Sequence, residues 1–195
     1  MELNIISLLY LFFRLAPFII VCYFSLASLF NQDMKGLIYL VGLLFACFCT
    51  FLVGQSFSFE TEGEKANICS LITVGNVGSF SKLPLGVTVL GYTFFYLVHI
   101  IVSKNLSAFN IPTLVFFPLL ILADIIWNIM NNCYNIGGII VSLIVGSIVG
   151  VIWAGVIAKM NNPSLLFLNI GSGQTACQRP SKQLFKCTFP EQKTD

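Results

Sequence analysis

The chain has 195 residues, of which 57% are hydrophobic and 9% are charged, and its formal net charge is +2. Soluble domains carry about 25% charged residues, so this composition excludes an ordinary soluble protein. A hydrocarbon core of about 30 Å requires roughly 20 consecutive apolar residues per helix. We therefore predict an all-α integral membrane protein with the lipid bilayer as its surroundings.

Five apolar runs of the required length follow one another along the chain. We expect transmembrane helices at about 5–30, 36–53, 85–102, 111–130 and 136–158. Residues 1–158 then form a membrane domain, which includes a polar loop at 54–84, and residues 159–195 form a basic tail outside the membrane. The first four residues, MELN, lack the positive charge that begins a secretory signal, so we expect the first run to be retained.

Two charged residues lie well inside the predicted helices, Arg14 in the first and Asp124 in the fourth. Either one alone near the bilayer centre costs about 2.5–3.5 kcal/mol on insertion scales. Their positions along the two runs give both residues similar depths on one side of the membrane. We predict an ion pair between Arg14 and Asp124. The alternatives are a water-lined site or ion path, and separate contacts of each residue with the interface.

Pro17 lies three residues after Arg14. Proline removes a backbone hydrogen bond from a helix, and its ring clashes with the preceding turn. The first helix is therefore expected to bend at this point.

The last run carries small residues at strict intervals of four. Residues four apart lie nearly over one another on a helix, so these residues form one smooth face. Such a face favours close packing against another helix, in the same chain, in a second copy or in a different protein. The six residues are Gly138, Ser142, Gly146, Gly150, Ala154 and Ala158.

Basic residues are distributed unevenly between the two predicted sides of the membrane. Lys65 and Lys82 are the basic residues of the side that holds the long loop and the 131–135 turn. The positive-inside rule then places the N-terminus outside and the tail in the cytosol. The basic residues of the cytosolic side are Lys35, Lys104, Lys159, Arg179, Lys182, Lys186 and Lys193.

Sequence motifs of common enzymes are missing from the chain. It contains no His-Glu-x-x-His, no Gly-x-Ser-x-Gly and no phosphate-binding Gly-rich Lys-Ser/Thr sequence. Its single histidine, His99, lies near the end of a predicted helix. We expect no enzymatic activity, no cofactor, no metal site and no nucleic-acid partner.

Two segments carry a resemblance to a family. Residues Phe80–Leu97 read FSKLPLGVTVLGYTFFYL, and residues Cys177–Cys187 read CQRPSKQLFKC. They resemble segments of uncharacterised polytopic membrane proteins encoded by nucleocytoplasmic large DNA viruses, the giant viruses. The resemblance covers about thirty residues and implies a place in the membrane beneath the icosahedral capsid. It carries over no catalytic residue.

With this resemblance, the tail becomes a candidate binding segment. Cys177 and Cys187 flank a short basic sequence with Arg179, Lys182 and Lys186. A disulfide could close this sequence into a hairpin, because viruses of this class resemble one another in carrying thiol oxidases. The alternative is two free thiols, as expected in the reducing cytosol.

The function expected from these observations is structural. The chain would be an assembly component of a virion inner membrane or host endomembrane. It would pack with other membrane or capsid proteins or with a second copy, and its tail would contact a capsid layer or anionic lipid. An alternative is a small ion channel or solute transporter in which Arg14 and Asp124 line a polar path. A membrane enzyme with thiol chemistry is a third possibility.

Overall fold

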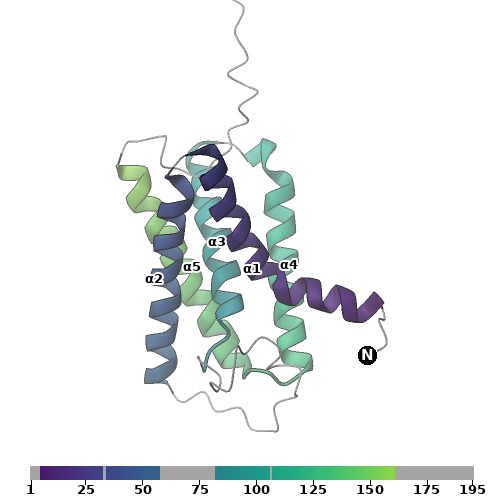
Figure 1. Cartoon of the computed structure of the whole chain (residues 1–195). Coiled ribbons are helices and arrows are strands. Elements are labelled where there is room, and N and C mark those ends of the chain that lie inside the picture. The colour runs from purple at the N-terminus through teal and green to yellow at the C-terminus, as the bar shows by residue number, and fades with distance from the viewer. Residues whose placement is uncertain (1–4, 33, 58–81, 106, 161–195) are drawn as a thin grey trace, which may run out of the picture.

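The computed structural model describes residues 5–32, 34–57, 82–105 and 107–160, and the side chains of 5–11, 13, 14 and 109 are outside this description. Every regular element in these residues is a helix, and no strand occurs among them (Figure 1). The predicted all-α fold is therefore confirmed. The elements are α1 (Ile5–Asn31), α2 (Lys35–Ser56), α3 (Leu85–Ser103), the 3-10 turn η2 (Ser107–Phe109), α4 (Ile111–Met130) and α5 (Ile136–Lys159).

Helices α2 to α5 run alternately up and down, and each is long and apolar enough to cross a membrane (Figure 1). They contain 19–24 residues. At 1.5 Å per residue these lengths correspond to roughly 29–36 Å, which matches the bilayer core. The protein is thus a multi-pass membrane protein. In α1, the apolar part among the residues with described side chains, Leu15–Asn31, is shorter than a full span.

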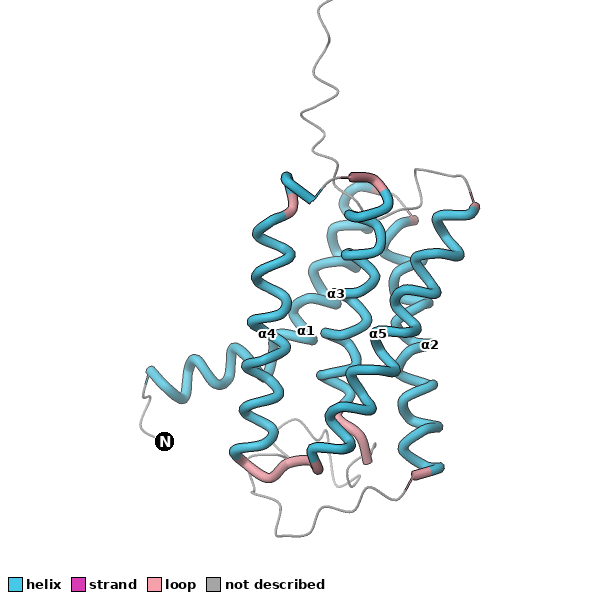
Figure 2. The backbone as a smooth tube through the Cα atoms, turned by 180° about the vertical axis from the view of Figure 1, so that it is seen from behind, coloured by secondary structure: helices cyan, strands magenta, loops and turns pink. Residues whose placement is uncertain are grey.

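Helix α1 is bent. Its C-terminal part runs beside α2, whereas its N-terminal part points away from the bundle, as both views of the backbone show (Figures 1 and 2). Pro17 lies inside this helix. A proline is the usual cause of a sharp kink, because it cannot donate to the preceding turn.

Helix α3 lies at the centre of the bundle and is the most buried of the four long apolar helices, α2 to α5. Its most extensive partner is α5, and it also contacts α1, α2 and α4. Large apolar side chains on the outer helices point away from the bundle, such as Leu44, Leu119 and Ile152. A helical bundle that exposes so much apolar surface is suited to lipid rather than to water.

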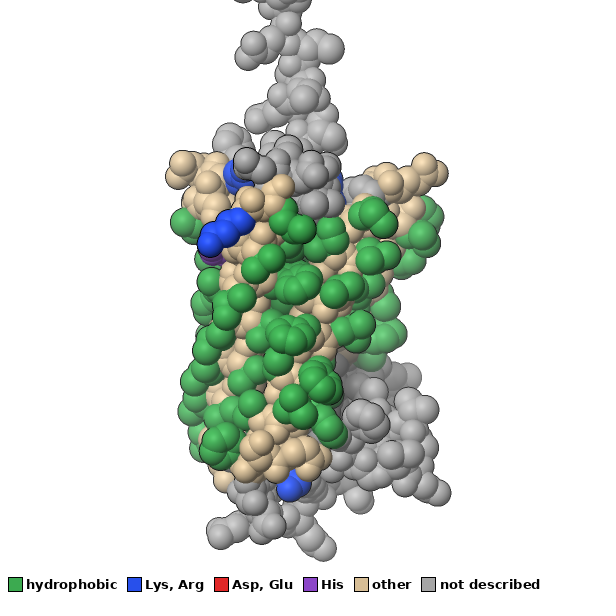
Figure 3. Space-filling model, turned by 90° about the vertical axis from the view of Figure 1, so that its left-hand side faces the viewer, with side chains coloured by type: hydrophobic (Ala, Val, Ile, Leu, Met, Phe, Trp, Pro, Cys, Tyr) green, Lys and Arg blue, Asp and Glu red, His purple; other side chains and the backbone are tan. Residues whose placement is uncertain are grey.

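The described lysine side chains gather at the ends of the bundle. Figure 3 shows hydrophobic side chains over the middle of one face and basic side chains near its upper and lower ends. Lys35, Lys104 and Lys159 lie at the end where α2 and α4 begin, and Lys82 lies at the opposite end, before α3. This distribution leaves an uncharged belt between the two ends.

Candidate functional site

The small-residue face of α5 lies directly against the backbone of α3. A Cβ atom added to Gly146 would lie 2.5 Å from the carbonyl oxygen of Thr88, and one added to Gly150 would lie 2.6 Å from that of Tyr92. Neither separation leaves room for a side chain. Five of the six predicted residues are buried, and Ala158 is half-buried. The partner of this face is therefore a helix of the same chain.

Hydroxyl groups join α2, α3 and α5 beside this contact. The Thr88 hydroxyl donates to the Thr50 hydroxyl oxygen at 3.2 Å, and it also lies 3.4 Å from the carbonyl oxygen of Ser142. Thr50 in turn donates to the carbonyl oxygen of Ala46 at 3.0 Å within its own helix. Hydrogen bonds of this kind fix the register of neighbouring helices where water is absent.

Three fully buried tyrosines fill the next layer of the bundle: Tyr39, Tyr92 and Tyr96. Their ring centroids lie 5.5–5.9 Å apart. The Tyr92 hydroxyl donates to the carbonyl oxygen of Tyr39 at 3.1 Å. The Tyr39 hydroxyl lies 2.6 Å from that of Thr93, which itself donates to the carbonyl oxygen of Val89. Tyr39 is therefore the donor to Thr93, and the aromatic layer closes this part of the interior.

Asp124 lies where α1, α3 and α4 meet. Its side chain is only 4% exposed. A Cβ atom added to Gly86 would lie 3.7 Å from the Asp124 carboxylate and 3.5 Å from Cγ of Pro17, so the carboxylate is close to both helices. One turn further along α4, Asn128 is fully buried, and its Nδ2 donates to the Asp124 carbonyl oxygen at 2.7 Å.

The predicted partner of this carboxylate, Arg14, belongs to α1, but its side chain is outside the described part of the structure. Arg14 precedes Pro17 by three residues, and residues three apart lie on the same side of a helix. Pro17 lies near the same residue of α3, Gly86, as the Asp124 carboxylate. The ion pair stays a prediction.

Two buried polar atoms lack a hydrogen-bond partner among the described atoms: the Ser142 hydroxyl oxygen and Oδ1 of Asn128. Both residues are fully buried. Leaving a buried polar atom without a hydrogen bond costs about 1–3 kcal/mol. The buried polar side chains thus form two groups: Thr50, Thr88 and Ser142 between α2, α3 and α5, and Asp124 with Asn128 on α4.

Sequence reasoning did not single out the residues of α3 that face α5 and α2. Thr88, Tyr92 and Tyr96 are four residues apart, which is the same interval as the small residues of α5. This spacing places the three side chains on one face of α3. Hydroxyl-bearing residues at intervals of four in an otherwise apolar run were the sequence signal that could have identified this face of α3.

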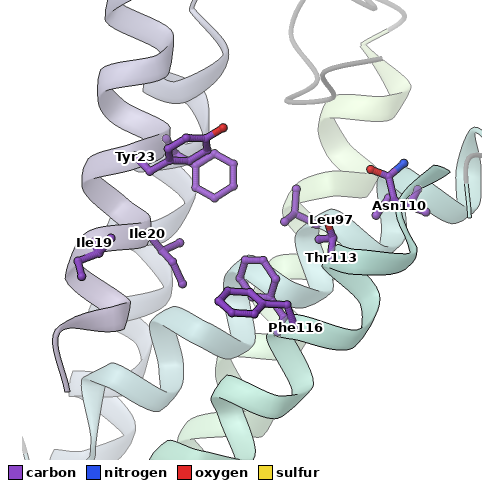
Figure 4. Close-up of a pocket in the computed structure, with 10 residues that line it drawn as sticks. Ile19, Ile20, Tyr23, Leu97, Asn110, Thr113 and Phe116 are labelled. Atoms are coloured by element: carbon purple, nitrogen blue, oxygen red, sulfur yellow. The ribbon is translucent and has the colours of Figure 1, made fainter. Parts of the chain in front are cut away.

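A lateral pocket of about 380 Å³ opens between α1 and α4, with α3 behind it. Figure 4 shows side chains of α1 on one side of the pocket and those of α4 on the other. Its walls are mostly apolar, and Asn110 and Thr113 add polar atoms where α4 begins. Such a lining suits an alkyl chain or a ring better than a charged group. The lining residues are Ile19, Ile20, Tyr23, Phe24, Leu97, Ile101, Asn110, Thr113, Phe116 and Phe117.

The remaining predicted site residues, Cys177, Cys187, Arg179, Lys182 and Lys186, lie outside the described residues. Within the described part of the chain, no three metal-binding side chains come together. Comparisons of the chain with protein-family models, with characterised proteins and with solved structures find no match.

Proposed function

We propose that this protein is a structural component of a viral membrane, which assembles with other membrane or capsid proteins. The supporting observation is the close packing of the helices in the interior of the bundle. The backbones of α3 and α5 touch at Gly146 and Gly150, and buried tyrosines fill the adjacent layer. Close packing of this kind favours a rigid scaffold, because it leaves little room for helices to move.

The outer surface supports the same proposal. Large apolar side chains on α2, α4 and α5 are exposed along the bundle, while basic residues collect at its ends. An apolar belt of this kind can pack against lipid or against a helix of a neighbouring protein. The basic tail supplies Arg179, Lys182 and Lys186 for a capsid layer or for anionic lipid headgroups.

The viral membrane is proposed from the sequence resemblance of Phe80–Leu97 and Cys177–Cys187 to giant-virus membrane proteins. Purified virions of a producing virus provide the test. We expect the protein to copurify with the particles and to yield cross-links from Lys182 or Lys186 to capsid protein. Replacing both lysines by glutamine should remove these cross-links and leave insertion of the bundle unchanged. Absence of the protein from detergent-washed particles would contradict the viral assignment.

A small channel or transporter is the second candidate, and the observation that favours it is the buried carboxylate of Asp124. An acidic side chain inside a membrane domain is expensive, and it often marks an ion path. Thr88 and Thr50 provide further hydroxyl groups in the same half of the bundle.

Ion flux into proteoliposomes tests this second function. If Asp124 carries ions, Asp124→Asn should abolish flux, whereas Asp124→Glu should retain part of it because the carboxylate remains. Equal flux in the wild type and Asp124→Asn would exclude this role for the carboxylate. No flux in the wild type for any common cation or anion would favour the structural function.

A further inference from the structure

The turn between α4 and α5 contains a cysteine that forms a disulfide. Cys133 is disulfide-bonded, and its side chain is 2% exposed. Its backbone N–H donates to the carbonyl oxygen of Asn128 at 3.0 Å, and the preceding residue, Asn132, has a positive φ of 51°. The turn therefore holds the Cys133 sulfur at the end of the bundle where α4 ends and α5 begins.

The chain contains six other cysteines, and one of them must provide the second sulfur of this disulfide. Cys22, Cys47 and Cys49 are free thiols within α1 and α2. The candidates that remain are Cys69, Cys177 and Cys187, which lie outside the described residues. We infer that the partner of Cys133 is Cys69, and that this end of the bundle faces an oxidising compartment.

The connectivity of the helices favours Cys69. Helix α2 ends and helix α3 begins at the same end of the bundle as Cys133 (Figure 1). The segment that carries Cys69 is thus attached on this side at both of its ends. Cys69 follows Phe57 by twelve residues, and a chain of that length can reach about 40 Å.

The tail cysteines are disfavoured by the length of α5. This helix has 24 residues, so it carries the chain roughly 36 Å from the Cys133 end. To reach Cys133, a tail segment would have to return through the hydrocarbon layer. Irregular, polar backbone exposed to lipid does not occur there, because its hydrogen-bonding groups would lack partners.

The disulfide also assigns the two sides of the membrane. When it forms, the two thiols lose two protons and two electrons, and the electrons reduce the disulfide of a thiol–disulfide oxidoreductase in that compartment to a dithiol. Such bonds form and persist in oxidising compartments, whereas the cytosol keeps thiols reduced. Lys35, Lys104 and Lys159 lie at the opposite end, which the positive-inside rule assigns to the cytosol. Two independent chemical signals therefore give the same orientation.

Peptide mapping of the full chain under non-reducing conditions tests the pairing. After alkylation of free thiols and digestion with trypsin and chymotrypsin, residues 66–71 should be found linked to residues 128–134. Cys69→Ser should abolish this product and leave Cys133 open to alkylation in denaturant, while the control Cys49→Ser should retain it. A link from Cys133 to Cys177 or Cys187, or an alkylated Cys133 in the wild type, would overturn the pairing.

The orientation has its own test in sealed endomembrane vesicles with the cytosolic face outward. A membrane-impermeant amine reagent should modify Lys193 in intact vesicles, and it should modify Lys65 only after the vesicles are permeabilised. Lys65 precedes Cys69 by four residues, so it reports the side on which the disulfide forms. Modification of Lys65 in intact vesicles would overturn the assignment of this end to the oxidising side.

Discussion

At the scale of single residues, Gly146 and Gly155 lie on the same helix but have different surroundings. A Cβ atom at Gly146 would meet the Thr88 carbonyl oxygen at 2.5 Å, whereas one at Gly155 would meet only Nε2 of His99, at 3.8 Å. The first position has no space for a methyl group, and the second has enough. The same substitution should therefore have opposite consequences at the two sites.

We predict that Gly146→Ala lowers the free energy of unfolding by about 1–3 kcal/mol, the usual cost of overpacking. Gly146→Leu should prevent stable folding. The control Gly155→Ala should be neutral or slightly stabilising, since alanine favours helix more than glycine does. Thermal unfolding in detergent, followed by circular dichroism, measures all three. Equal stability of Gly146→Ala and Gly155→Ala would show that the α3–α5 contact is looser than described.

Asp124 is the second residue for which a single change is informative. If Arg14 pairs with it, Arg14→Asp and Asp124→Arg should each reduce the yield of folded protein, because each leaves two like charges in the membrane. The double exchange should restore much of the yield. Size-exclusion chromatography of detergent extracts gives the measurement. A double variant no better than either single variant would exclude the pair.

At the scale of elements, α2 is held by polar groups of its neighbours as well as by packing. Tyr39 donates to Thr93, and Trp153 donates to the carbonyl oxygen of Ile38 at 3.1 Å. The first of these bonds joins α2 to α3, and the second joins α2 to α5. In a membrane these bonds replace part of the hydrophobic driving force, which is weak between helices surrounded by lipid.

We predict that Tyr39→Phe lowers stability by about 0.6 kcal/mol, the average for hydrogen bonds between membrane helices. Thr93→Val should have a similar effect, and the double variant should cost less than the sum of the two. Tyr23→Phe is the matched control, because the Tyr23 side chain is 60% exposed. Unfolding titrations of the four variants in mixed micelles provide the comparison. Strict additivity would mean that the two hydroxyl groups do not interact.

At the scale of the whole molecule, the described lysines divide between the two ends of the bundle. Lys35, Lys104 and Lys159 occupy one end, and Lys82 precedes α3 at the other. No charged side chain is described in the outer belt between them. The orientation in the membrane should therefore depend on these few residues.

Replacing Lys35, Lys104 and Lys159 together by glutamine should produce molecules of mixed orientation, because it reduces the charge difference between the two ends on which the positive-inside rule acts. The matched arginine variant should insert like the wild type. Protease accessibility of the tail in sealed vesicles measures the fraction of each orientation. An unchanged single orientation of the glutamine variant would show that another feature decides the topology.

The sequence by itself determined the class of the protein, the positions of its helices and the bend at Pro17. These follow from local properties: the length of apolar runs, their charges, and a residue that cannot continue a helical hydrogen-bond pattern. The sequence also identified the small-residue face of α5, because residues four apart share one side of any helix.

Only the tertiary structure decided what these faces meet. A period of four identifies a face but not its neighbour, so the pairing of Gly146 and Gly150 with the backbone of α3 had to come from the arrangement of the helices. The same holds for Asp124, which has α1 and α3 beside it. Contacts between helices depend on how all of them fill the bundle together, and this packing is not encoded in any one segment.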